Sequence, residues 1–538
     1  MTNRAVARSA AGHAGATSID RSAESLASHL EDAAHFPGGR ADGIAKPRTE
    51  AEVSALVAAA THVLPIGAQS SVTGGATPTG GLLLSTERLK TIESATGNHV
   101  RSGAGVPLDT LQEHLAAEGR WYPPTPTFTG AFVGGVIATN AAGAATFKHG
   151  TTRQWIDGLT LVLPCGHVLD LMRGEVTADP ARGFEIVCDC GTRRFAAPSY
   201  RMPAVPKCAA GYFSAPNMDL IDLFIGSEGT LGVVVSATVR VAPVKPALAL
   251  ALIPVRTERQ GVALVRDIRA AAEATWRSHD AAGIDVAAIE HLDRRCLQVL
   301  REDGADRAQS IGVPDGTDLL LIVQLELAPA TTAERAFEDV SSALDASGRD
   351  SAIGRFARLL ADHEAFDQTE LAMPGDTRRI NQMLALREAA PVGVNRRVGD
   401  VKRLLDSRID KTAGDMIVPF DRFEDMLAIY RAGYERRGLD YAIWGHISDG
   451  NVHPNVIPRS YDDVVAGREA ILEFGREAIR LGGSPLAEHG VGRSSLKQKL
   501  MRELYGDAGI EEMRAIKRAI DPDCKLAPGV LFSRATQP

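Results

Sequence analysis

Apolar positions in the first quarter of the chain alternate between a helical and an extended spacing. Residues 49–60 place apolar side chains on one helical face, and Thr49 and Glu52 form a capping-box pattern at its start. Continuous apolar runs predict strands over 63–66 and 81–85. Leucines at 108, 111 and 115 predict a further helix that ends near Gly119. This alternation predicts a domain that mixes helices and strands.

The pattern changes twice further along the chain. Residues 159–163 and 166–171 predict a hairpin, and strands are expected over 184–188 and 233–241, so that a first domain ends near Pro243. From Ala247 onward, longer strands and helices alternate in a way that suits a ferredoxin-like α+β domain. The strands expected there are 248–255, 319–327 and 441–455, and the helices are 258–276, 332–347, 421–436, 461–481 and 508–520.

Composition excludes several classes of protein. The 538 residues are 44% apolar and 23% charged, with a net charge of -8 and a pI near 6.0. These values are typical of a globular protein and argue against nucleic acid or an anionic membrane as the main partner. No apolar run reaches 18 residues, so no membrane span is expected. The stretch 1–17 has no apolar core of a signal peptide, and we expect a disordered lead over 1–24.

Cysteine usage indicates a reducing compartment. Six cysteines in so long a chain do not make a disulfide framework. Cys165, Cys188, Cys190 and Cys208 fall within one region, and the C-x-C pair supplies half of a metal site. The spacing to the other two cysteines fits no zinc-ribbon or ferredoxin pattern, so we expect neither a metal nor a cluster there.

Two glycine-rich stretches stand out from the surrounding pattern. Residues 130–163 place Gly130, Gly134, Gly135 and Gly143 among alanines and small β-branched residues. Residues 65–75 form a second glycine loop, directly after the first clear strand, with Ser70, Ser71 and Thr73 as hydroxyl donors. Such glycines indicate either a tight packing seam or a cradle in which the backbone approaches a flat or charged ligand.

Four motifs that follow one another along the chain carry a resemblance to a known family. They are the loop 65–75, the stretch 134–143, Lys148-His149-Gly150-Thr151-Thr152 and the turn 224–232. Together they resemble the FAD-binding domain of the vanillyl-alcohol oxidase and p-cresol methylhydroxylase superfamily. The similarity is greatest to its branch of D-lactate dehydrogenase and glycolate oxidase, and it extends from about residue 45 to the C-terminus.

The resemblance implies an FAD site. The segment 122–126 would lie along the cofactor, and 140–143 beside the isoalloxazine. His149 stands where the family often has Tyr and is a conceivable covalent attachment point, but the lactate-like branch binds FAD non-covalently and we expect the same here. Ala527 replaces an Asn of the family's C-terminal motif, so a side-chain hydrogen bond near the flavin is absent or supplied elsewhere. The implied cofactor-binding residues are Ile66, Gly67, Ala68, Gln69, Ser70, Ser71, Gly74, Pro124, Thr125, Gly134, Gly135, Thr139, Asn140, Gly143, Glu228, Gly229, Val233 and Val234.

A second group of polar residues lies near the C-terminus. His446 and His453 flank a turn-forming Asp-Gly-Asn, and Glu488-His489 follows later. From the residues alone, the histidines are either ordinary loop residues or ligands for Zn, Mn or Fe. The runs resemble the family's H-x-G-D-G-N-x-H and E-H-G-x-G motifs, which implies that His446, His453 and Glu488 bind a divalent metal. Ser448 replaces the first Gly of the motif and is expected to change the turn.

The resemblance also implies a reaction. His489 would remove the hydroxyl proton of a 2-hydroxy acid while hydride passes from Cα to flavin N5. A metal would polarise the hydroxyl and orient the substrate. Arg387 resembles the family's carboxylate-binding arginine, with an exposed helical arginine as the alternative. The lysine that dicarboxylate-oxidising members carry before D-x-x-x-P is absent, and Lys411 is out of step, which argues against a dicarboxylate substrate.

We therefore predict an α+β protein in two parts. The FAD-binding domain, of the p-cresol methylhydroxylase type and itself in two parts, covers 25–243. A ferredoxin-like α+β cap domain with a C-terminal helical segment covers 244–538. The expected activity is FAD-dependent oxidation of a D-2-hydroxy acid, D-lactate first, with one divalent metal.

The expected partners follow from this activity. The electron acceptor would be a quinone, a cytochrome or an electron-transfer protein, and the location cytoplasmic, with peripheral attachment to the inner membrane and homodimerisation left open. The alternatives are an enzyme similar to ether-lipid synthase, which uses FAD without net redox, and a non-catalytic FAD-binding subunit. The family's ether-lipid branch carries a run of histidines in its cap, and this chain has no such run.

Overall fold

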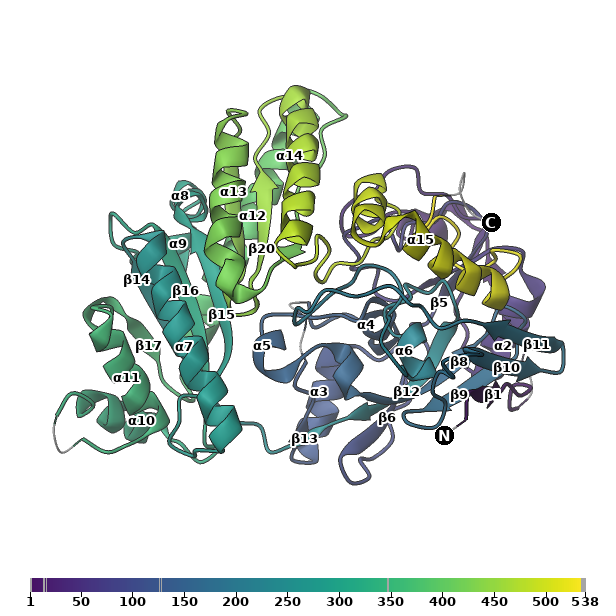
Figure 1. Ribbon diagram of the computed structural model, residues 1–538, viewed down its shortest axis with the longest axis horizontal. Helices are drawn as coiled ribbons and strands as arrows, with labels where there is room; N and C mark the ends of the chain where they lie inside the picture. The colour runs from purple at the N-terminus through teal and green to yellow at the C-terminus, as the bar shows by residue number, and fades with distance from the viewer. Residues whose placement is uncertain are drawn as a thin grey trace. The chain divides into compact units, whose positions relative to one another are not determined.

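The computed structural model describes residues 2–12, 15, 17–124, 126, 128–345 and 348–533. The chain divides into two compact units (Figure 1). Unit 1 comprises 1–143, 150–243 and 484–538, and unit 2 comprises 144–149 and 244–483. The architecture is a mixed α+β fold, as predicted.

The first sheet of unit 1 holds the strands that precede the glycine loop. β4, predicted over 63–66, is observed as Val63–Ile66, and β5 pairs with it in parallel. Helix α2 begins after Thr49, whose side chain accepts a hydrogen bond from the Glu52 N–H. The sheet runs in the order β2 (Ile19–Asp20), β3 (Gly43–Ala45), β5 (Leu82–Ser85), β4. Along the chain, helix α1 (Ala23–Ala27) lies between β2 and β3, and helix α2 (Glu50–Ala59) lies between β3 and β4.

The second sheet of unit 1 is antiparallel and contains the predicted hairpin. Its strands follow the order β6 (His99–Gly103), β12 (Val233–Arg240), β8 (Ile156–Val162), β9 (Val168–Met172). A two-stranded sheet pairs β13 (Ala242–Pro243) with β7 (Arg120–Trp121). A three-stranded sheet has the order β1 (Arg4–Val6), β10 (Phe184–Cys188), β11 (Gly191–Phe195). The helices are α3 (Leu108–Ala117), α4 (Val133–Thr139), α6 (Leu220–Phe224) and α15 (Ser495–Ile520), with a 3₁₀ turn at Thr152–Trp155.

Two domain assignments differ from the prediction. The expected disordered lead contains β1, which pairs in parallel with β10 through Arg4 and Glu185 and is followed by an Arg8–Asp170 hydrogen bond. The segment 484–538, expected in the cap domain, belongs to unit 1. Its buried Lys517 donates to the Thr230 carbonyl, and its Leu526 bridges to Val63. Buried hydrogen bonds of this kind fix the segment to the first unit, a relation that sequence order cannot reveal.

Unit 2 is built on one antiparallel sheet, with long helices packed against it (Figure 1). The sheet runs in the order β17 (Glu370–Ala372), β14 (Ala247–Val255), β16 (Leu319–Leu327), β15 (Val286–Asp293), β19 (Tyr441–His446), β20 (Asn451–Val456), β18 (Met416–Ile417). The helices are α5 (Thr146–His149), α7 (Glu258–Ser278), α8 (Arg294–Glu302), α9 (Ala305–Ala308), α10 (Ala333–Ser341), α11 (Ala352–Asp362), α12 (Thr377–Leu404), α13 (Phe423–Glu435) and α14 (Tyr461–Arg480).

Close packing of α13 on α14 shows how small and aromatic residues cooperate in unit 2. The Phe474 ring meets the rings of Tyr430 and Tyr434 edge-on, at centroid distances of 5.1 and 4.9 Å. A side chain at Gly433 would put its Cβ 2.3 Å from the Phe474 ring. A glycine is therefore required there for the two helices to approach this closely.

Candidate active site

A cavity of about 370 Å³ lies within unit 1. The loop after β4, helix α4 and the turn before β12 form its walls, so the two glycine-rich stretches meet as predicted. The predicted residues that line it are Ile66, Gly67, Ala68, Gln69, Ser70, Ser71, Gly134, Gly135, Thr139, Glu228, Gly229, Val233 and Val234. Aromatic residues that the sequence did not single out, among them Phe128, Phe132 and Phe224, complete the lining.

Some predicted cofactor residues have other positions. Gly74, Pro124, Asn140 and Gly143 are not among the lining residues in the described part of the chain, and Thr125 lies outside that part. Asn140 ends α4 in a left-handed conformation with φ of 48°, and its side-chain oxygen accepts from the Arg153 N–H at 2.9 Å. The Gly74 N–H donates to the buried Asp32 carboxylate at 2.6 Å. Asp32, which no sequence motif indicates, thus holds the glycine loop in place.

The glycines of α4 have two different roles. A Cβ at Gly134 would lie 2.7 Å from Ala104 Cβ, so this glycine serves close packing. A Cβ at Gly135 would meet no described atom within 4 Å, and this residue opens onto the cavity. The packing seam and the ligand cradle are both present, one residue apart. The stretch forms an α-helix over Val133–Thr139 although glycine lowers helix propensity.

A buried carboxylate fixes the loop that carries His489. Glu228 accepts hydrogen bonds from the Val491 N–H at 2.7 Å and the Gly492 N–H at 2.8 Å. Burial, the largest influence, raises the pKa of Glu228 above its usual value, although both N–H groups oppose the shift. Glu488 and His489 line the cavity from this loop. Glu228 is thus both a lining residue and the anchor of the loop.

Glu488 has a partner that the sequence did not assign. The Lys207 Nζ lies 2.9 Å from Glu488 Oε2, and both side chains are buried. The second oxygen of Glu488 lies 3.5 Å from His489 Nε2. The Lys207–Glu488 ion pair brings the segment that begins at Lys207 to the wall of the cavity. Its only sequence signal is the K-x-x-A-G-Y run that begins at Lys207.

In unit 2, a β-hairpin holds His446 and His453. His446 is the last residue of β19, His453 lies in β20, and the two buried rings are 5.6 Å apart at their centroids. Gly450, at φ of 79°, allows the turn between them, because a Cβ there would lie 2.3 Å from the Val418 carbonyl oxygen. The hairpin therefore brings together the two imidazoles that the sequence separated by seven positions.

A carboxylate connects His446 to Arg387. Glu290 Oε1 lies 2.6 Å from His446 Nδ1, and Arg387 Nε donates to Glu290 Oε2 at 2.7 Å. Burial alone would raise the pKa of Glu290, but the charges of Arg387 and His446 outweigh it and hold that pKa at about 2. Arg387 is only 8% exposed, so the alternative of an exposed helical arginine is wrong. Glu290, whose strand β15 the sequence analysis did not predict, is a missed member of this group.

The Ser448 substitution has a structural consequence. Its buried hydroxyl accepts from the Ile289 N–H at 3.2 Å and donates to Asp449 at 3.4 Å. The turn is thereby tied to β15, which a glycine could not do. Asp415 lies on the other side of the hairpin, with its carboxylate 3.5 Å from His453 Nδ1.

His149 belongs to unit 2 and is engaged by an acid. Its Nε2 lies 2.9 Å from Glu326, and the neighbouring Lys148 Nζ contacts both Glu326 and Asp285. The pKa of Glu326 is lowered: burial raises it, but His149 and Lys148 together prevail. These contacts account for the Lys-His pair as an anchor of α5 on the sheet of unit 2.

Two family models match the chain. The model of an FAD binding domain matches residues 41–172, and the model of the C-terminal domain of FAD linked oxidases matches residues 256–531. The second match alone covers more than half of the chain. No helix in the described residues combines the length and apolarity needed to cross a membrane.

Three curated relatives align over nearly the whole chain. Glycolate oxidase subunit GlcD of Bacillus subtilis is 29% identical over 508 residues, 92% of this chain and 89% of that protein. D-lactate dehydrogenase of Archaeoglobus fulgidus is 27% identical over 497 residues, 90% of each. D-2-hydroxyglutarate dehydrogenase of Xanthomonas citri pv. viticola is 27% identical over 509 residues, 92% of this chain and 90% of that protein.

A solved structure shares the fold. An alkyldihydroxyacetonephosphate synthase superposes with a TM-score of 0.56 at 15% identity, covering 95% of this chain and 83% of that one. Identity this low supports the architecture and carries no statement about activity.

Proposed function

Because this chain belongs to the FAD-linked oxidases, we propose that it oxidises a D-2-hydroxy acid, D-lactate first, to the 2-oxo acid. Its relatives include proteins named D-lactate dehydrogenase, glycolate oxidase subunit and D-2-hydroxyglutarate dehydrogenase. The observation that carries the proposal is His489 in the wall of the unit 1 cavity, on a loop that Glu228 holds.

The cavity in unit 1 fits FAD. Its lining combines apolar and aromatic walls with the hydroxyls of Ser70 and Ser71, and Gly135 presents bare backbone. A flat aromatic cofactor with a diphosphate needs this combination of apolar contact, hydrogen-bond donors and close backbone approach. When bound, FAD supplies the hydride acceptor. We expect the cofactor to be held without a covalent bond.

His489 is proposed as the base. Its side chain is 36% exposed and faces a cavity, so the imidazole is accessible to a substrate hydroxyl. Imidazole accepts protons near neutral pH, as removal of a hydroxyl proton requires. Glu488 Oε1 lies 3.5 Å from its Nε2. The proton would thus pass from the substrate oxygen to His489.

Arg387 is proposed to bind the substrate carboxylate. Its guanidinium offers five N–H donors in a fork, of which Nε donates to Glu290 and Nη1 to Glu388. These two contacts would orient the guanidinium toward an anionic substrate. A lysine that could meet a second carboxylate is missing before Asp415, so we propose a monocarboxylate rather than a dicarboxylate.

His446, His453 and Glu488 are proposed to hold one divalent ion, Zn, Mn or Fe. The Glu290 contact at His446 Nδ1 is the arrangement that orients a histidine ligand and raises its basicity. The ion would polarise the substrate hydroxyl. Lys207 donates to Glu488 at 2.9 Å.

The electrons would leave to a quinone, a cytochrome or an electron-transfer protein, and we place the enzyme in the cytoplasm. Two rival functions remain distinct from this one. An ether-lipid synthase activity would use the flavin with no net redox. A non-catalytic subunit would bind FAD and not react.

Anaerobic mixing with hydroxy acids tests the proposal. The purified protein should be yellow and should release free FAD on denaturation. D-lactate should bleach the flavin, while L-lactate should not, and glycolate and D-2-hydroxyglutarate should react more slowly. A yellow protein that no hydroxy acid bleaches would favour the rival functions. A colourless protein that takes up no added FAD would remove the cofactor itself.

A further inference from the structure

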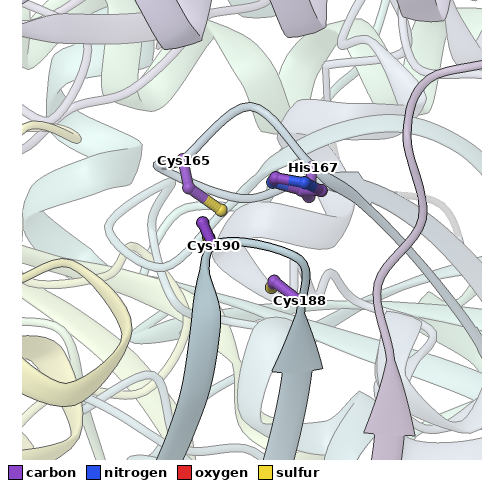
Figure 2. A group of neighbouring side chains, drawn as sticks. All are labelled: Cys165, His167, Cys188 and Cys190. Atoms are coloured by element: carbon purple, nitrogen blue, oxygen red, sulfur yellow. The ribbon is translucent and has the colours of Figure 1, made fainter.

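Three cysteines and one histidine meet at the tips of two hairpins in unit 1 (Figure 2). Cys165 and His167 lie in the turn between β8 and β9. Cys188 ends β10, and Cys190 lies in the tight turn to β11, where Gly191 adopts a φ of 126°. The two hairpins belong to different sheets, so their tips are brought together from separate parts of the fold.

The four ligand atoms are close enough to surround one ion. One sulfur or ring nitrogen from each residue lies within 4.8 Å of all the others. A tetrahedral site with Zn–S near 2.3 Å and Zn–N near 2.0–2.1 Å places its ligand atoms about 3.5–3.8 Å apart. The group therefore needs to contract by about 1 Å at most, which side-chain rotation can supply. In a [4Fe–4S] cluster each thiolate binds a different iron, so the thiolates lie further apart than around a single ion.

His167 carries a second, independent sign of a ligand. Its Nδ1 is buried and, within the described part of the chain, has no hydrogen-bond partner. A buried polar atom without a partner is costly and calls for an explanation such as an ion. The other ring nitrogen, Nε2, lies 3.9 Å from the Asp189 carboxylate. A carboxylate behind a histidine is the usual second contact of a metal-binding imidazole.

We propose that these four side chains bind one Zn²⁺ ion. Sulfur and imidazole together select zinc, and three cysteines with one histidine form one of the usual closed structural sites. Binding would displace three thiol protons to solvent and involve no electron transfer. Cys190 is exposed, so an ion has a path into the group.

Arg193 balances the charge of such a site. Its guanidinium lies 3.4 Å from Cys188 Sγ and within 3.5 and 3.6 Å of Cys190 Sγ. Three thiolates and one Zn²⁺ leave a net charge of about -1, which the guanidinium offsets. Arg193 lies in β11, so the β10–β11 hairpin holds its backbone close to Cys188 and Cys190. It would therefore act by stabilising thiolates and not as a ligand.

The ion would join two sheets of unit 1. β8 pairs with β12, whose Val233 and Val234 line the cavity, while β10 pairs with β1 and β11. A metal ion at both hairpin tips would hold the β10–β11 hairpin against the β8–β9 hairpin. The sequence analysis missed the site because it counted Cys208 and left out His167. In the structure, the Cys208 sulfur lies instead near Ser484 and Tyr505.

X-ray absorption at the zinc edge of the intact protein tests the proposal directly. Protein purified in the presence of Zn²⁺ and a thiol reductant should show about three sulfur ligands near 2.3 Å and one nitrogen near 2.0–2.1 Å. Sulfur ligation also separates this site from the metal proposed at His446, His453 and Glu488, which has no thiolate. Recording the spectrum in His453→Ala would leave only the thiolate-bound zinc, whatever the outcome at the flavin.

Variants give a second, matched measurement. Cys188→Ser and His167→Asn should each lose about one zinc per chain by elemental analysis. Cys524→Ser, a thiol of unit 1 outside the group, should keep it. Arg193→Met should retain zinc with affinity about 10–100-fold weaker. FAD content should stay at the wild-type level in Cys524→Ser and Arg193→Met.

The proposal fails on either of two results. Wild-type protein with no stoichiometric zinc after purification with Zn²⁺ would overturn it, most clearly if peptide mapping finds a disulfide within the group. A zinc spectrum without sulfur ligands would overturn it equally. Neither result would bear on flavin bleaching by a hydroxy acid, so the proposed function is tested separately.

Discussion

Arg387 is a buried cation between two acids, and its surroundings define two separate roles. Its Nε donates to Glu290 at 2.7 Å and its Nη1 to Glu388 at 2.9 Å. The pKa of Glu290 lies near 2, so this acid stays ionised and the pair is a buried salt bridge. Such a pair is destabilised strongly when only one partner is removed. A loss of activity on mutating Arg387 therefore does not by itself identify a substrate contact.

A double variant separates the two roles. Arg387→Met should cost about 3–5 kcal/mol of unfolding free energy, because Glu290 is left buried without its cation. Adding Glu290→Gln should restore most of that stability but not the affinity for the hydroxy acid. Urea titrations and substrate titrations of flavin bleaching measure the two quantities. If the double variant binds substrate as wild type does, Arg387 has only a structural role.

Among the elements, strand β15 concentrates buried ionisable groups. Glu290, His291 and Asp293 follow one another within it, and all three are almost fully buried. Burial lowers the pKa of His291 to about 4 and raises that of Asp293 to about 6. Both ring nitrogens of His291 lack a hydrogen-bond partner among the described residues. The strand therefore makes the stability of unit 2 depend on pH.

The sign of that dependence follows from proton binding. Between pH 6.5 and pH 4 the unfolded His291 binds a proton that the folded residue does not, so stability falls as pH falls through this window. Asp293 acts in the opposite direction, because its folded state keeps a proton up to about pH 6. His291→Leu removes only the first effect. The difference in unfolding free energy, variant minus wild type, should rise by about 3 kcal/mol as the pH is lowered from 6.5 to 4.

Urea titrations of both proteins from pH 4 to pH 6.5 measure this difference in unfolding free energy. Titrations above pH 6.5 serve as the reference. Above pH 6.5 the difference between variant and wild type should become constant. A difference that does not change with pH would mean that His291 titrates alike in the folded and unfolded chain.

Individual elements also show how far the sequence could lead. Some strands were predictable to the residue, such as β4 and β10, and Thr49 marked the start of α2. β15 was not, because its charges interrupt the apolar pattern although all are buried. Helix α12 continues through Pro391, which a local rule would treat as a stop. Tertiary burial decided both cases, and no local pattern records it.

At the scale of the whole molecule, the residues proposed for catalysis come from both units. The motifs pointed to the residues proposed to bind FAD, to His489 and to the His446–His453 pair, because each motif is contiguous in sequence. The side chains that contact them, such as Lys207, Glu228 and Glu290, come from distant segments. Residues 484–538 likewise belong to unit 1, although they follow unit 2 in the sequence. Sequence motifs therefore indicate the groups proposed to react, and the fold supplies the groups that position them.

The proposed metal at the flavin depends on ligands from both units. His453→Ala should lose this ion while retaining FAD, because the cavity of unit 1 contains no part of β20. Its flavin reduction should slow, since the hydroxyl is no longer polarised. His279→Asn, at an exposed position in unit 2, is the matched control and should keep the ion. Elemental analysis together with FAD content decides this, and an unchanged metal content in His453→Ala would exclude the proposed ligand set.

The most direct test of the account is the rate of anaerobic flavin reduction in His489→Asn. At saturating D-lactate, the variant should bind FAD as wild type does but reduce it about 10²–10⁴-fold more slowly, the usual cost of removing a general base. Reoxidation of the reduced flavin by an added acceptor should be unchanged, because that step requires no proton from the substrate hydroxyl. A stopped-flow trace in which His489→Asn is reduced as fast as wild type would contradict the assignment of His489 as the base.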